Sequence, residues 1–362
     1  MPVSFIVQSA ATADLRISGE NPAYANVRPL YTDHIQVNVY KRAKGAYADD
    51  ETGFAFDKKV VLPCEIPAGA YLYAGFPYAY ASGVVNMEKG YEYRTTAFAY
   101  AGQRGERDLF SFTESGAFTD AALSLTDAAQ YSTPELFFGT PRYGADMRDK
   151  EAGSVVFSYE SGAIDALGGW LYRCVAGVGL TLRKVPPEVK ELALLSNSVN
   201  TQCKAPRYDD FLTPDGNQTA AAGEESVRYI LDKWSRPSDW VSVYGVDAVT
   251  DSIDVSINES NLLPVTSTLY VRITETADDG SDKVTVVPLR MKLKVDADGV
   301  PVTPDDGVNT AEKLSSGTLV SRRNHYYQIA GAYLTLVTKQ LPLAISINPN
   351  WAGDIDLTPG GK

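Results

Sequence analysis

Few residues in this chain have the types and spacings that enzymes use. The only two histidines, His34 and His325, lie at opposite ends of the chain, each in or beside an expected strand. A Ser-His-Asp or Cys-His arrangement needs a histidine beside a nucleophile and an orienting carboxylate, and no Gly-x-Ser-x-Gly turn is present. Gly177 and Gly179 lead into no helix, so they indicate a bulge or close packing in a strand and not a dinucleotide loop. We expect no catalytic residue, no cofactor and no enzymatic activity.

Acidic clusters at 278–282, 296–298 and 305–306 raise the question of calcium binding. The helix-loop-helix calcium pattern fails, because the position that needs a bidentate Glu, counted from Asp296, holds Gly307. Hairpin turns with Asp-Gly explain these clusters better. We therefore expect no metal site.

The cysteines support the same conclusion. They occur at Cys64, Cys174 and Cys203, without the spacing of a metal site. Cys174 alternates with four apolar residues on one face of an expected strand: Ala176, Val178, Leu180 and Leu182. The pattern predicts that Cys174 is a buried apolar thiol.

Length and charge limit the remaining classes of protein. A chain of 362 residues exceeds the usual size of one hydrophobic core, which favours two domains. Its formal net charge of −12 disfavours electrostatic binding to nucleic acid. No apolar run approaches the roughly 20 residues needed to span a bilayer, and no signal peptide is visible at the start. We expect either a cytosolic protein or a trimmed sequence of an exported one, and the β-rich composition favours the second.

Apolar and polar residues alternate with period two in many short segments, which predicts strands. The expected strands are 34–42, 69–75, 93–101, 153–159, 251–257, 268–274, 283–295, 326–336 and 343–347. Helical patterns are short, at 118–129 and 224–231. Short strands separated by turns predict an all-β fold of sandwiches or barrels. A polar turn region near residue 150 divides the chain into domains 1–150 and 151–362, the second with a loop insertion near 197–222.

Three segments carry a resemblance to a known family. The run from Arg322 to Tyr333 and the strand that ends at Trp351 resemble the final strand pair of fimbrillin-type subunits of type V (Bacteroidia) pili. The segment 134–139, followed by Arg173-x-x-Ala176, looks like the junction that opens the second domain in the anchor-like branch of that family. The order and spacing of these segments cover about residues 30 to 351.

The resemblance implies two transthyretin-like β-sandwich domains in tandem and export as a lipoprotein to the outer membrane and cell surface. It also implies assembly with other pilus subunits by donation of a β-strand, which satisfies an exposed sheet edge. The lipid-bearing N-terminal cysteine of the family is missing from this sequence. In the family, stalk subunits lose their first strand to a protease that cuts after Arg, which makes Arg16 and Arg28 the candidate cleavage sites. An anchor keeps that strand.

The closing segment and two tryptophans leave alternatives open. Ile355 and Leu357 are spaced for a short donor strand or belong to a frayed tail. A second hypothesis is a surface lipoprotein that binds glycan or a host protein through exposed aromatics, with Trp234 and Trp240 as stacking candidates. Packing against the sandwich is the other interpretation of these tryptophans. A hydrolase, the third class, would need clustered carboxylates in a cleft.

Overall fold

The computed structural model describes most of the expected strands. The described residues are 2–8, 34–63, 78–100, 103–104, 107–108, 110–126, 136–144, 153–158, 167–204, 220–222, 229–238, 242–243, 246–247, 250–302, 307–323 and 325–348. None of the helices in these ranges is long and apolar enough to cross a membrane. Strands dominate, so the expected all-β class is confirmed.

The first half of the chain holds thirteen strands and one short 3-10 helix in its described parts. The strands are β1 (Pro2–Gln8), β2 (His34–Ala43), β3 (Ala55–Pro63), β4 (Tyr78–Val84), β5 (Tyr91–Tyr100), β6 (Gln103–Arg104), β7 (Arg107–Asp108), β8 (Phe110–Phe112), β9 (Ala122–Leu125), β10 (Leu136–Gly139), β11 (Arg142–Tyr143), β12 (Phe157–Ser158) and β13 (Leu167–Arg173). The 3-10 helix η4 spans Phe118–Asp120.

The second half contributes the remaining elements. They are β14 (Ala176–Val185), β15 (Val189–Ser196), β16 (Ser198–Asn200), β17 (Gln202–Lys204), β18 (Ala220–Ala222), β19 (Tyr229–Ser235), β20 (Ser242–Val243), β21 (Val246–Asp247), β22 (Ile253–Leu262), β23 (Thr266–Thr276), β24 (Asp282–Pro288), β25 (Met291–Leu293), α1 (Ala311–Ser315), β26 (Thr318–Val320), β27 (Tyr326–Ala332), α2 (Tyr333–Thr338) and β28 (Leu343–Asn348).

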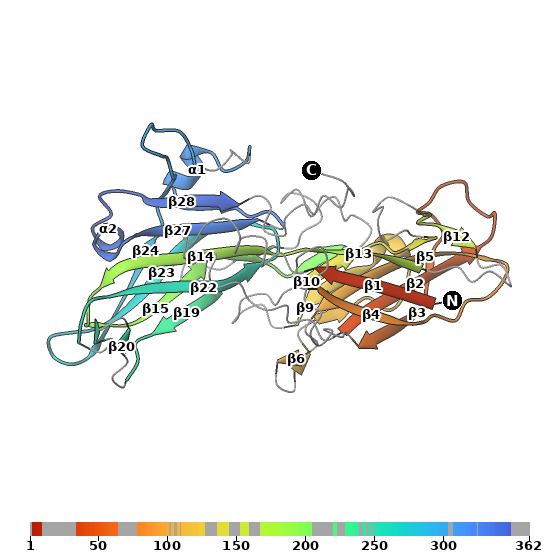
Figure 1. Ribbon diagram of the computed structural model, residues 1–362, viewed down its shortest axis with the longest axis horizontal. Helices are drawn as coiled ribbons and strands as arrows, with labels where there is room; N and C mark the ends of the chain where they lie inside the picture. Colours follow the sequence, from red (N-terminus) through yellow and green to blue (C-terminus); the bar gives the residue numbers. More distant parts are fainter. Residues whose placement is uncertain are drawn as a thin grey trace, which may run out of the picture.

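One large sheet organises the first half, with the strand order β3-β2-β5-β10-β13-β1-β4 (Figure 1). Its strands alternate apolar residues onto two faces. Ala97 and Ala99 of β5 belong to a cluster on one face, whereas Phe98 belongs to an aromatic cluster on the other. The small sheet β17-β9-β8 contributes Phe110 and Leu123 to the aromatic cluster. The large sheet is therefore covered by apolar packing on both faces.

The second half is a sandwich of two sheets. The sheet β22-β14-β27-β28-β25 faces the sheet β19-β15-β23-β24, and β26 also pairs with β23. Buried residues of both sheets form one core, among them Leu180 of β14, Leu192 of β15 and Ile329 of β27. The register of β14 against β22 shifts between Val178 and Leu180, which places a bulge at Gly179, one of the two roles expected for the glycines.

The chain leaves the large sheet of the first half at the end of β13 and enters the sandwich of the second half at β14. The intervening Cys174 and Val175 are fully buried in the aromatic cluster of the first half. The predicted burial of Cys174 is confirmed. β13 belongs to the large sheet, and β14 belongs to the second half. The expected boundary near residue 150 stays a prediction.

Part of the expected loop insertion at 197–222 consists of short strands. β16 pairs with β18, and β17 crosses to pair with β9 of the first half. The Gln202 amide group donates to Ser124 Oγ at 3.1 Å, and Leu125 N donates to the carbonyl of Thr201 at 2.8 Å. This segment therefore joins the two halves.

Several expected boundaries were wrong. The predicted helix at 118–129 contains η4 and strand β9. Of the predicted helix at 224–231, the described residues 229–231 belong to strand β19. The predicted strand 326–336 stops at Ala332, where α2 begins, and the predicted strand 283–295 is divided between two sheets. The expected strand at 69–75 lies outside the described residues. These errors share a cause, because tertiary pairing overrides weak local propensity.

Candidate strand-pairing site

The first strand, β1, fills a position inside the large sheet. It pairs in parallel with β13 and antiparallel with β4, so it has a ladder on each side (Figure 1). Val3 lies opposite Leu167 and Val7 opposite Leu171 in the parallel register. We call the position between β13 and β4 the β1 slot. A strand from the start of the chain thus completes a sheet whose other strands come from residue 34 onward.

The wall of the β1 slot formed by β13 belongs to the apolar core. Leu167 and Leu171 are buried, at 0% and 4% exposure, and they join the cluster that contains Ile35 and Val37 of β2. Withdrawal of β1 would leave the backbone edge of β13 beside this cluster unpaired. An unpaired edge favours the return of a strand to the slot.

The other wall, β4, depends on β1 for its only ladder among the described strands. All seven residues of β4 pair with β1, from Val84 opposite Pro2 to Tyr78 opposite Gln8. β4 is therefore an end strand of the sheet. Its position must be maintained by something other than strand pairing if β1 is absent.

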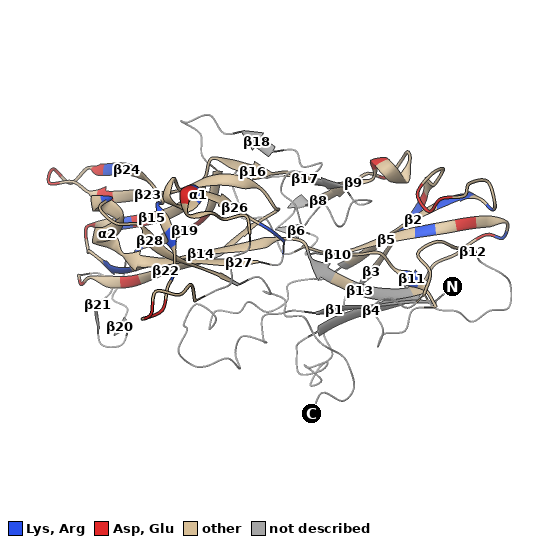
Figure 2. Cartoon of the chain, turned by 90° about the horizontal axis from the view of Figure 1, so that it is seen from above, with Lys and Arg blue, Asp and Glu red and all other residues tan. Residues whose placement is uncertain are grey.

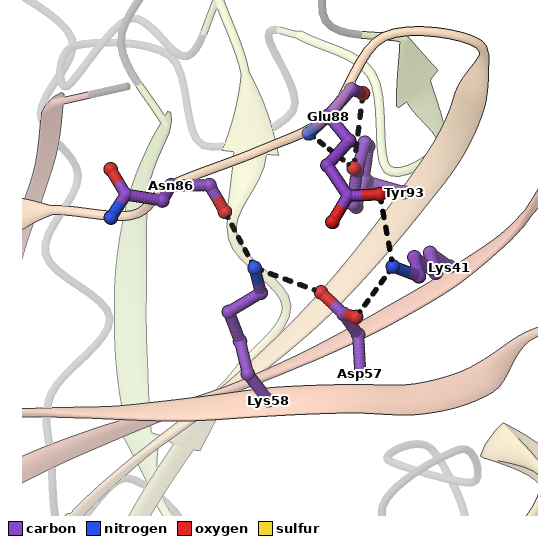
Figure 3. Close-up of polar contacts among 6 residues, drawn as sticks. All are labelled: Lys41, Asp57, Lys58, Asn86, Glu88 and Tyr93. Atoms are coloured by element: carbon purple, nitrogen blue, oxygen red, sulfur yellow. Dashed lines mark hydrogen bonds and ion pairs between the residues drawn. The ribbon is translucent and has the colours of Figure 1, made fainter.

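A polar network fixes the chain just after β4 (Figure 3). We call it the clasp, and its members are Lys41, Asp57, Lys58, Asn86, Glu88 and Tyr93. Lys58 Nζ of β3 donates to the carbonyl oxygen of Asn86 at 2.9 Å. Lys41 Nζ of β2 lies 3.3 Å from Glu88 Oε2. The clasp thus joins β3 and β2, at one end of the sheet order, to the chain that leaves β4, at the other.

Tyr93 of β5 holds the chain after β4 through the backbone of Glu88. Its hydroxyl accepts from the Glu88 amide at 2.6 Å and donates to the Glu88 carbonyl at 3.0 Å. The Tyr93 ring is fully buried and stacks on Phe157 of β12, with ring centroids 6.1 Å apart. The hydroxyl is therefore held in place by packing beneath it.

A bulge in β3 places Asp57 in the clasp. In the register against β2, Lys58 lies opposite Val39, and Phe56 lies opposite Tyr40. Asp57, between them, has no residue opposite it on β2. Bulges redirect side chains, and here the carboxylate lies 2.8 Å from Lys41 Nζ and 3.1 Å from Lys58 Nζ. Asp57 therefore connects the two lysines.

The charges of the clasp stabilise one another. Partial burial raises the pKa of Asp57, but hydrogen bonds from Lys41 and Lys58 outweigh it, so that its pKa lies below the ordinary value. The hydrogen bond to Asp57 is the main cause that holds the pKa of Lys41 above its ordinary value. Both groups are therefore charged at neutral pH, as their ion pair requires.

Apolar contacts hold residues 85–88 from the side opposite the clasp. Val85 is fully buried in the cluster under β2, and Met87 packs against that cluster. Along 85–88, the odd residues thus face the core, while Asn86 and Glu88 join the clasp. The segment that follows β4 is held on both faces.

Charged residues of both signs lie close together on β2 and β5 (Figure 2). Arg42 Nε lies 2.8 Å from Glu92 Oε2, and its guanidinium donates to the Thr52 carbonyl at 2.7 Å.

Among the described residues, no group of three His, Cys, Asp or Glu side chains is placed to hold a metal ion.

The candidate cleavage and donor residues lie outside the described parts of the chain; they are Arg16, Arg28, Ile355 and Leu357. Their roles stay predictions. Both arginines follow β1 in the chain, so a cut at either would separate β1 covalently from the rest of its sheet.

Only one of the two stacking candidates, Trp234, lies within the described residues. Trp240 lies outside the described residues. Trp234 of β19 is half-buried and packs against the core of the second half. The Arg236 guanidinium lies over its ring, 5.4 Å from the centroid, and is held by backbone carbonyls, including that of Pro186 at 2.7 Å. These contacts fit the packing interpretation of Trp234.

The segments that carried the family resemblance lie at structurally connected places. Arg173 ends β13 and Ala176 begins β14, so the Arg-x-x-Ala segment spans the change of sheet. β27 and β28 form the expected terminal strand pair, and the two strands are antiparallel, with Ile329 opposite Ile345. The Gly177 amide donates to the carbonyl of His325 at 2.9 Å, so the start of β14 is tied to the start of β27.

The clasp was not found by sequence reasoning. Its members are scattered between residues 41 and 93 and match no motif. Single Lys, Asp and Glu residues near strand ends are common on surfaces, so their types give no signal. Only the pairing of strands β2, β3 and β5 brings them together.

Comparisons with known proteins find similar solved structures at low sequence identity. No family model matches the chain, and no curated protein matches it. Among solved structures, it is similar to the fimbrial anchor protein Mfa2 from Porphyromonas gingivalis, with 13% identity, TM-score 0.34, and coverage of 96% of this chain and 98% of the other. The tip fimbrial protein Mfa3 from the same organism, with C-terminal truncation, shows 10% identity, TM-score 0.38, and coverage of 96% and 99%.

A third similar structure is a proposed polysaccharide-binding protein from Bacteroides thetaiotaomicron. It shows 12% identity and a TM-score of 0.39, with coverage of 96% of each chain. Two of the three structures are described as fimbrial proteins. At these identities and TM-scores, the function has to come from the residues of this chain.

Proposed function

We propose that this chain is a subunit of a cell-surface fimbria and that it assembles with other subunits by exchange of a strand at the β1 slot. The observation that carries the proposal is the place of β1 between β13 and β4. β1 comes from the start of the chain and enters a sheet built by strands far along the sequence. Such a strand can be replaced by one from another molecule without rearrangement of the remaining strands.

The physical chemistry of the slot suits a strand donor. An empty slot would present two unpaired backbone edges, one on β13 and one on β4, and an incoming strand would satisfy both. Backbone hydrogen bonds would supply affinity for any extended segment. Specificity would come from alternate side chains that meet the cluster containing Leu167 and Leu171.

We propose an anchor-like or minor role within the fimbria. A chain that keeps β1 has a filled slot and accepts no donor, so it would end a fibre at that position. A cut after Arg16 or Arg28 would instead free β1 and open the slot. The same sequence thus has two assembly states, and proteolysis selects between them.

The C-terminal segment and an N-terminal lipid would make the remaining attachments. Ile355 and Leu357 would supply apolar positions of a donor strand to a neighbouring subunit. Attachment to the outer membrane would use an N-terminal lipid outside this sequence, as the family resemblance implies. Partners are other fimbrial subunits, and the formal charge of −12 disfavours nucleic acid.

Two experiments test the proposal. Deletion of residues 352–362 should reduce incorporation of the subunit into fibres, and unchanged incorporation would contradict the donor role. Limited cleavage with an arginine-specific protease, followed by mass spectrometry and size-exclusion chromatography, should give a nicked protein that binds other subunits. An intact chain that binds them equally well would rule out the β1 slot as the acceptor.

A further inference from the structure

Departure of β1 would leave β4 without a ladder partner among the described strands. All of its pairs are with β1, and no other described strand lies at its outer side in the sheet order. An end strand without hydrogen-bonded neighbours loses its ordered position unless other contacts hold it. If β4 moved away, the slot would have one wall instead of two.

The chain immediately after β4 has contacts that do not involve β1. Asn86, two residues beyond the end of β4, accepts from Lys58, and Glu88 is held by Lys41 and by Tyr93. Val85 is fully buried beneath it. These contacts join β4 to β3, β2 and β5, all of which remain paired with one another when β1 is absent.

We propose that the clasp keeps β4 in place after β1 leaves, so that the β1 slot is preformed for a strand from another subunit. Lys58 and Lys41 act here as positioning residues, because they contact the chain just after β4 and not the incoming strand. The inference rests on the proposed strand exchange. The clasp is the part of the chain that would hold the acceptor slot in its binding conformation.

A preformed slot matters for affinity. When only a fraction of the molecules has the conformation that binds, the apparent affinity falls in proportion to that fraction. If the loss of the clasp lets β4 populate the correct position only about a tenth of the time, the apparent dissociation constant of a donor strand rises about tenfold. The clasp is suited to this purpose because it does not use the backbone edges that the donor needs.

The test uses the complete chain with residues 2–8 replaced by a Gly-Ser sequence of the same length, which empties the slot. A fluorescent peptide of residues 2–8 is titrated into this protein and its anisotropy is measured. The same titration is made with Lys58→Met added. Lys59→Met is the matched control, because Lys59 is the next residue of β3 but pairs with Glu114, outside the clasp.

The expected result is binding that weakens about tenfold in Lys58→Met and stays unchanged in Lys59→Met. Equal affinity in all three proteins would overturn the role of the clasp while leaving strand exchange intact. Absence of binding in all three folded proteins would instead overturn strand exchange at this slot.

A measurement on the intact chain covers the case in which the replaced chain does not fold. The Glu88 amide, which donates to Tyr93, reports on the clasp, and the amides of β1 report on the slot. In hydrogen exchange, the Glu88 amide should exchange at least about tenfold more slowly than those of β1, since the clasp outlasts β1. Equal or faster exchange at Glu88 would show that the clasp opens with or before β1 and would overturn the inference.

Discussion

Lys58 Nζ donates a hydrogen bond to the carbonyl oxygen of Asn86 at 2.9 Å, and this contact joins the two ends of the large sheet. Lys58 belongs to β3, which ends the strand order on one side, and Asn86 follows β4, which ends it on the other. The Lys58 side chain therefore connects two end strands that, among the described strands, are not paired with each other. This connection gives the first strand a bounded slot.

Lys58→Met should lower the free energy of unfolding by about 1 kcal/mol, because it removes a hydrogen bond and an ion pair while keeping the apolar stem. Urea denaturation followed by circular dichroism measures the change. Lys59→Met, which removes the more exposed pair with Glu114, should change stability by less than about 0.5 kcal/mol. Equal losses in the two variants would argue against a special role for Lys58.

Tyr93→Phe should cost about 1 to 2 kcal/mol, because the Glu88 amide and carbonyl both lose a partner while the ring keeps its packing on Phe157. Thermal and urea unfolding of the variant measure this loss. The Glu88 amide should also exchange faster in the variant. A neutral effect on both would mean that water replaces the hydroxyl without cost.

Acid should weaken the clasp. The folded-state pKa of Asp57 lies below its ordinary value, so its contribution to stability is fully present above the ordinary carboxyl pKa, near 4, and is lost as the pH falls through the folded-state pKa. The stability difference between the wild-type chain and Asp57→Asn should therefore be constant from pH 5 to 7 and shrink below about pH 4. Denaturant titrations across this range measure it, and a difference that does not change down to pH 2 would contradict the ion pair.

Cys174 should not react with thiol reagents in the native protein. It is fully buried, and burial raises the pKa of its thiol to about 12, so the reactive thiolate is scarce at pH 8. A Cys64→Ser/Cys203→Ser chain isolates this thiol, and Ellman's reagent should label it only after denaturant is added. Rapid labelling of the native chain would place the thiol at the surface.

Trp234→Ala should lower the free energy of unfolding by about 2 kcal/mol, since the indole packs against the core of the second half and the Arg236 guanidinium lies over its ring. The same variant should leave any signal on a glycan array unchanged. If the array signal disappears and stability does not change, the stacking interpretation is correct. Trp240→Ala provides the parallel test at the other candidate.

The sequence alone predicted the elements whose pattern is strong and local. The alternation of Ile35, Val37 and Val39 predicted β2, and that of Cys174 with its neighbours predicted a buried thiol, because a period of two places every second residue on one face. It also excluded the usual catalytic and phosphate-binding motifs. Where the pattern was weak, as at 118–129, the expected helix was replaced by strand β9, which pairs with β17 from the second half.

Only the tertiary structure decided which edges meet. Neither the position of β1 between β13 and β4 nor the clasp that unites Lys41, Asp57 and Glu88 is visible in the order of residues. The reason is physical: backbone hydrogen bonds are the same for every sequence, so an extended segment does not specify its partner. Pairing is set by the burial of many side chains at once, and the pairing then brings distant charges together.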